Sequence, residues 1–124
     1  MKLTLNGIKE TAAWEAAGIK LPSYSIEQVA EETKKALVWV HFGAGNIFRI
    51  FIGGLADRLI TQGEMKKGIT CVETFDYDVV DKIYDPYDNL GLSMSFCNGL
   101  NHHLKCHQII CRNHRLIIMK VDFM

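Results

Sequence analysis

An apolar run ends at two closely spaced glycines, and this junction constrains the fold more than any other feature of the chain. Residues 37–42 are apolar except for His41, a pattern that indicates a strand covered on both faces, as in parallel sheets. Gly43 and Gly45 follow at once, and a helix-forming segment begins near Asn46. A buried strand that turns through glycine into a helix is typical of parallel α/β folds.

The segment before this strand predicts a lead-in and one helix. Residues 1–24 look irregular, with a helical turn over residues 11–17. Ser25 and Gln28 have the spacing of a capping box, which predicts a helix over residues 26–36. We expect four residues on its buried side, namely Ile26, Val29, Ala30 and Thr33.

A longer helix is expected after the glycines, over residues 46–62. Its apolar residues recur at spacings of three and four, which predicts one buried stripe. That stripe comprises Ile47, Ile50, Phe51, Leu55 and Leu59. Asp57 and Arg58 would then lie on the opposite side, and Gly63 stands where a helix C-terminal cap belongs.

A second strand and a short helix complete the pattern. The strand is expected over residues 69–75, and Asp76 is placed to cap a helix that carries Val79, Val80 and Ile83. Asp85 precedes Pro86 and should end that helix. The order strand, glycine turn, helix, strand, helix predicts a right-handed parallel crossover. The predicted fold class is therefore α/β, a partial Rossmann-type parallel sheet that forms the N-terminal portion of a dinucleotide-binding domain.

The glycine turn has the features of a diphosphate site. Gly43 permits a tight turn, Gly45 lets the backbone approach phosphates, and the helix start offers free amides and a positive dipole end. Phe48 replaces the usual third glycine, and Arg49 is either a charge for the diphosphate or an exposed helix residue. The expected contact residues are Gly43, Ala44, Gly45, Asn46, Ile47, Phe48 and Arg49.

A dinucleotide site also needs a carboxylate after the second strand, to bind the adenosine ribose. Glu73 and Asp76 both qualify, 30 and 33 residues after Gly43, compared with a common spacing of about 20. An acid there favours NAD over NADP, because a carboxylate repels the 2′-phosphate. The plainer alternative is that the two glycines form only a turn.

Residues 39–49 resemble the mannitol dehydrogenase family, the polyol-specific long-chain dehydrogenases and uronate reductases. The family signature is Gly-x-Gly with an arginine four residues after the second glycine, which Gly43, Gly45 and Arg49 match. Residues 14–22 look like the N-terminal arm of that family, and residues 73–84 are similar to its fructuronate reductase (mannonate oxidoreductase) branch. The resemblance covers about residues 3–93.

The resemblance implies reversible hydride transfer between NAD(H) and a ketose, a polyol or a hexuronate. It also implies a two-domain enzyme several times longer, whose later domain holds the catalytic lysine, an asparagine five residues on and a histidine three further. No lysine of this chain is followed five positions later by asparagine. We therefore expect no catalytic residue here, and an NAD-binding fragment that is inactive alone; a defunct fragment without any activity remains an alternative.

The composition changes abruptly near residue 94. Residues 1–93 carry 13 acidic and 10 basic side chains, whereas residues 94–124 carry one acidic and four basic ones. The tail also holds most of the zinc-ligand types, namely Cys97, His102, His103, Cys106, His107, Cys111 and His114. Three interpretations stay open: a frameshifted or foreign C-terminus, a divergent genuine ending, and a small zinc-binding interaction module.

The bulk composition excludes several other classes. The formal net charge of zero argues against a nucleic-acid partner, and no apolar run approaches the roughly 20 residues of a membrane span. The first residues carry no secretory signal, so we expect a cytoplasmic protein with reduced cysteines.

Overall fold

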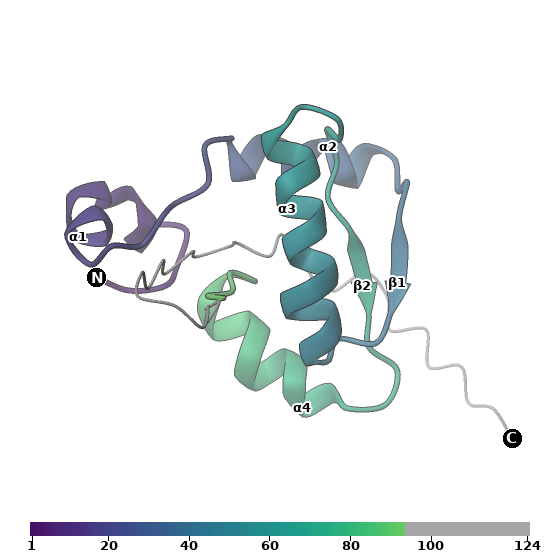
Figure 1. Cartoon of the computed structure of the whole chain (residues 1–124). Helices are drawn as coiled ribbons and strands as arrows, with labels where there is room; N and C mark the ends of the chain where they lie inside the picture. The colour runs from purple at the N-terminus through teal and green to yellow at the C-terminus, as the bar shows by residue number, and fades with distance from the viewer. Residues whose placement is uncertain (94–124) are drawn as a thin grey trace, which may run out of the picture.

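The computed structural model describes residues 1–93, and it shows two parallel strands with helices packed against them (Figure 1). The elements are, in order, η1 (Gly7–Lys9), α1 (Thr11–Ala16), α2 (Ile26–Lys35), β1 (Val40–Phe42), η2 (Ile47–Ile52), α3 (Gly53–Thr61), β2 (Thr70–Val72), α4 (Tyr77–Val79), η3 (Val80–Tyr84) and η4 (Asp85–Tyr87). Within this part of the chain, no helix has the length and apolar character needed to cross a membrane.

The two strands pair in parallel, so the α/β fold class is confirmed. Val40 lies opposite Thr70, His41 opposite Cys71, and Phe42 opposite Val72. The connection between them runs through η2 and α3, which follow one another without a break. Both strands are shorter than the sequence predicts, with three residues each. The order of elements, however, is the predicted one.

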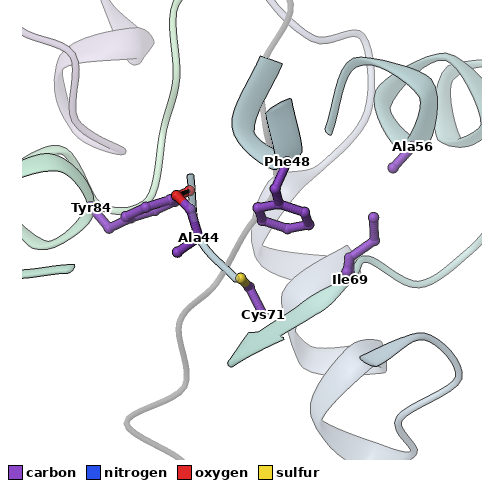
Figure 2. Close-up of a cluster of buried hydrophobic side chains, with 6 residues drawn as sticks. All are labelled: Ala44, Phe48, Ala56, Ile69, Cys71 and Tyr84. Atoms are coloured by element: carbon purple, nitrogen blue, oxygen red, sulfur yellow. Dashed lines mark hydrogen bonds between the residues drawn. The ribbon is translucent and has the colours of Figure 1, made fainter. Parts of the chain in front are cut away.

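One apolar cluster joins the glycine turn, the long helix, β2 and η3 (Figure 2). It comprises Ala44, Phe48, Ala56, Ile69, Cys71 and Tyr84. These residues are far apart in the sequence, so the cluster holds the start of the helix against the second strand. Burial of this apolar surface is the main favourable contribution to the stability of the turn.

The predicted start of α2 is confirmed by its cap. The Ser25 hydroxyl oxygen accepts a hydrogen bond from the Gln28 amide at 3.2 Å, as expected of an N-cap serine. Val29, Ala30 and Thr33 are buried as predicted, whereas Ile26 is only half-buried. The Thr33 hydroxyl also accepts the Gly68 amide at 2.7 Å, and this bond fixes α2 to the loop before β2.

The predicted buried face of the long helix is wrong. Ile47 and Phe51 are 78% and 59% exposed, and Ile50 and Leu59 are exposed as well; Leu55, the fifth residue of the predicted stripe, is half-buried. The residues that are buried instead are Phe48, Gly53, Gly54, Ala56, Asp57 and Ile60. The first part of the helix, η2, is a π-helix, whose wider turn does not follow the 3.6-residue period on which the prediction rests.

A buried carboxylate on α3, that of Asp57, also separates the observed buried face of the helix from the predicted one. Asp57 was expected on the outer side, yet it is buried and accepts a hydrogen bond from the Tyr24 hydroxyl at 2.7 Å. Burial, followed by this bond to Asp57, raises the pKa of Tyr24 far above its ordinary value. The bond links the lead-in segment to α3 and turns the Asp57 side of the helix inward.

The expectation that β1 is covered on both faces is also wrong for the described part of the chain. Val38, Val40 and Phe42 are exposed, while the alternating residues Trp39 and His41 are half-buried. Residues on a strand alternate between its two faces, so one face of β1 packs inward and the other is open. The apolar run alone does not distinguish these two arrangements, because it supplies apolar residues to both faces.

Candidate functional site

The turn after β1 requires glycine at its first position. Gly43 has φ +99°, a backbone conformation that residues with a side chain rarely adopt. Its amide donates to the Val72 carbonyl at 2.8 Å, so the turn begins while the chain is still paired with β2. The predicted role of Gly43 as the residue that allows the tight turn is confirmed.

Gly45 differs, because the fold does not require a glycine there. A Cβ atom added at Gly45 would meet no atom of residues 1–93 within 4 Å, and the φ of Gly45 does not lie in the left-handed region. The space beside this residue is therefore open, which is the arrangement expected where a ligand approaches the backbone. Its proposed contact with phosphate stays a prediction.

The start of the helix, directly after Gly45, carries positive charge. The amide of Arg49 donates to the Gly45 carbonyl at 2.9 Å, and the preceding amides begin the helix, where intrahelical acceptors are lacking. The Arg49 guanidinium donates to the Asn46 side-chain oxygen at 2.7 Å. A full positive charge is thus held in the first turn, where the helix dipole also favours an anion.

Ala44, between the two glycines, is fully buried and is held from both sides. Its amide donates to Oε2 of Glu73 at 2.8 Å, and its carbonyl accepts the hydroxyl of Tyr84 at 2.7 Å. Figure 2 shows Tyr84 lying against Ala44. The structure therefore brings Glu73 and the glycine turn together, as the sequence predicts, and adds Tyr84, which the sequence analysis missed.

Glu73 is bound to backbone amides through both of its oxygens. Besides the Ala44 amide on Oε2, its Oε1 accepts the amides of Thr74, Phe75 and Asp76 at 3.0, 2.9 and 3.2 Å. Burial raises the pKa of this carboxyl, but the four backbone hydrogen bonds together outweigh burial and hold it below its ordinary value. Glu73 is therefore ionised, and its hydrogen bonds connect the turn after β1 to the segment after β2.

This pKa shift makes a prediction about stability. A carboxyl whose pKa is lowered by folding stabilises the folded state above its unfolded pKa of about 4.3, and this contribution is lost as the pH falls through the folded pKa. Glu73→Gln should therefore lower the free energy of unfolding most above about pH 5, and the difference from the parent chain should shrink below about pH 4. Urea unfolding at a series of pH values measures it; a difference that is independent of pH would contradict the assignment.

Asp76 does not cap the short helix, contrary to the sequence prediction. It stands at the N-cap position of α4, but its side chain makes no capping hydrogen bond, and its backbone ψ of 84° departs from the usual geometry of a capped start. The amide of Asp76 is instead directed at Glu73. The Asp76 carboxylate is exposed and lies three residues beyond Glu73, at the same end of β2.

Phe48, at the position of the usual third glycine, is 3% exposed and belongs to the apolar cluster. Its ring stacks on the ring of His41 with 4.5 Å between centroids and 18° between planes. An aromatic ring thus fills the space between β1 and the helix start that a glycine leaves for close packing. Gly53 and Gly54, both buried, lie about one turn further along.

The remaining thiol and metal-ligating side chains of residues 1–93 form neither a nucleophilic nor a metal site. Cys71 is a free, buried thiol whose pKa burial and the nearby Glu73 charge raise to about 12, so it is protonated at neutral pH and is no nucleophile. No group of three His, Cys, Asp or Glu side chains there is arranged to hold a metal ion. The zinc ligands suggested by the sequence, and the compositional break itself, lie outside the described residues.

Comparison with known proteins finds a relative that matches most of this chain. The chain is 43% identical over 95 residues to a D-mannonate oxidoreductase from Thermotoga maritima. The aligned residues make up 77% of this chain. The chain spans 18% of the length of that relative. No family model matches the chain, and no solved structure matches it. The resemblance inferred from the motifs is confirmed by this relative.

Proposed function

This chain belongs to the mannitol dehydrogenase family, and on that premise we propose that residues 1–93 are the NAD-binding part of an oxidoreductase that acts on a CH–OH group of a sugar acid. The relative is named for its action on D-mannonate, which supports a hexuronate or the corresponding hexonate as the substrate class. NAD supplies the hydride acceptor and donor for such a reaction.

One observation carries the proposal. The glycine turn follows β1, Glu73 follows the parallel strand β2, and a 2.8 Å hydrogen bond from Ala44 joins the two. In open parallel sheets, ligands bind at the carboxyl ends of the strands. This geometry supports the proposal, because it brings the glycine turn, which suits a phosphate group, next to a carboxylate that is able to accept ribose hydroxyls.

We assign the diphosphate to the turn and the first helical turn. Its contact residues are Gly43, Ala44, Gly45, Asn46, Ile47, Phe48 and Arg49, of which Phe48 contributes its backbone because its ring is buried. Glu73 and Asp76 bind the adenosine ribose. Oε2 of Glu73 has one backbone donor and retains a lone pair, while the exposed Asp76 carboxylate makes no capping bond.

The chain is not expected to turn over a substrate. The catalytic lysine, asparagine and histidine that the family resemblance implies have no counterpart at the family spacing in these 124 residues. Binding of NAD(H) and reduction of a sugar acid are therefore separate steps in the proposal, and the first of them is the one to measure on this chain.

The experiment is a titration of the 124-residue chain with NADH and NADPH, followed by nicotinamide fluorescence. We expect NADH to bind at least about tenfold more tightly, which corresponds to about 1.4 kcal/mol of repulsion between the acids and the 2′-phosphate. The Asp76→Asn variant should narrow this preference for NADH. Asp88→Asn should not, because Asp88 follows η4 and its carboxylate accepts the Leu5 amide rather than a group of the glycine turn. Equal binding of both nucleotides, or of neither, would contradict the proposal.

A further inference from the structure

We propose that Tyr84 is a positioning residue that fixes the Ala44–Gly45 peptide so that the Gly45 amide is directed toward the dinucleotide. The inference rests on the proposed function for the identity of the ligand. Its structural part, the orientation of one peptide group by one hydroxyl, is independent of that identity and is tested separately.

Two successive peptide groups of the turn are fixed by hydrogen bonds. In the Gly43–Ala44 peptide, the carbonyl accepts from the Cys71 thiol at 3.4 Å and the amide donates to Glu73 at 2.8 Å. In the Ala44–Gly45 peptide, the carbonyl accepts from the Tyr84 hydroxyl at 2.7 Å. The first peptide is thus held at both of its polar groups, and the second at its carbonyl.

The hydrogen bond from Tyr84 to the Ala44 carbonyl also determines the orientation of the Gly45 amide, because both groups belong to one peptide. A trans peptide is planar, and its carbonyl and amide point in opposite directions. Since the Ala44 carbonyl points at Tyr84, the Gly45 amide points away from Tyr84. No residue of 1–93 accepts that amide, and Gly45 itself is exposed. It is therefore a donor that the turn presents to the open space beside Gly45.

Tyr84 is suited to this role because its ring cannot move freely. The side chain is 2% exposed and belongs to the apolar cluster around Phe48 and Ile69. It comes from η3, 40 residues after Ala44 in the sequence. A buried hydroxyl held in a packed cluster is a fixed donor, and fixed polar groups lose little freedom when a ligand binds. A phenylalanine would fill the same space without that donor.

The variant that tests the inference is Tyr84→Phe, with Tyr24→Phe as its matched control. Both changes remove one tyrosine hydroxyl with a 2.7 Å hydrogen bond, but that of Tyr24 bonds to Asp57, away from the turn. We expect both variants to unfold at lower urea concentration than the parent. Only Tyr84→Phe should weaken NADH binding, by about tenfold, or about 1.4 kcal/mol.

A second readout separates the positioning role from general destabilisation. In ¹⁵N relaxation measurements without nucleotide, the Gly45 amide of the parent should have an order parameter of about 0.85, as in rigid backbone. Tyr84→Phe should lower this value, and Tyr24→Phe should not. An unchanged order parameter at Gly45 in folded Tyr84→Phe would overturn the inference, whether or not the chain binds NADH.

The parent chain gives a test that needs no variant. On addition of NADH, the Gly45 amide resonance should shift strongly, and the Ala44 amide, which Glu73 already accepts, should shift little. The reverse order would overturn the inference even if Tyr84→Phe does not fold. A parent with a rigid Gly45 amide that loses its order in Tyr84→Phe, but without NADH binding, would support the positioning role and refute the proposed function.

Discussion

Replacing Phe48 by alanine should lower the free energy of unfolding by about 3–5 kcal/mol, the cost of emptying a buried aromatic site. Phe48 is 3% exposed and packs between the glycine turn and β2, with its ring stacked on His41. Domains of this kind are stable by only about 5–15 kcal/mol, so the loss is a large share of the total. Urea denaturation followed by far-ultraviolet circular dichroism measures the change.

Phe51→Ala is the matched control, because Phe51 lies on the same helix and is 59% exposed. Its replacement should change the free energy of unfolding by no more than about 0.5 kcal/mol. The pair of variants therefore decides which face of the helix is buried. If Phe51→Ala were the more damaging change, the stripe predicted from the sequence would be right and the packing described above wrong.

The contrast between Phe48 and Phe51 shows that the order of the elements is predictable from the sequence, whereas the buried face of the helix is not. Strand, glycine turn, helix and second strand are each encoded by neighbouring residues, so their order is predictable from Gly43, the capping serine Ser25 and the apolar runs. The buried face of the helix is not local. It depends on the π-helical start and on the bond between Tyr24 and Asp57, which are 33 residues apart.

The candidate site likewise combines features that neighbouring residues determine with features that depend on contacts between distant residues. The position of Glu73 follows from the rule that parallel strands end at one edge, and the structure brings its carboxylate to the turn. That Glu73 binds four backbone amides depends on the path of residues 74–76, which no pattern specifies. Tyr84 carries no sequence signal at all, because a tyrosine 40 residues from the turn becomes relevant only once the chain is folded.

Gly45→Asp should abolish dinucleotide binding while leaving the fold intact, an effect of at least about 100-fold, or about 2.7 kcal/mol, on the dissociation constant. A carboxylate about 4 Å from a phosphate charge repels it by about 4 kcal/mol at an effective dielectric constant of 20. The fold should tolerate the change, because a Cβ at Gly45 meets no atom of the described residues within 4 Å. An acid beside a helix start even stabilises it, by about 0.3–1 kcal/mol. NADH titration and urea unfolding of the same sample give both quantities.

Gly45→Asn separates charge from bulk, since asparagine has the size of aspartate without its charge. If the diphosphate lies against Gly45, the asparagine variant should lose affinity through contact alone and retain more of it than the aspartate variant. Opposite signs for stability and binding in Gly45→Asp distinguish a ligand site from a structural glycine, because a structural glycine such as Gly43, at φ +99°, loses both together when it is replaced. NADH binding by Gly45→Asp with unchanged affinity would place the nucleotide elsewhere, and the open space beside this residue would then need another occupant.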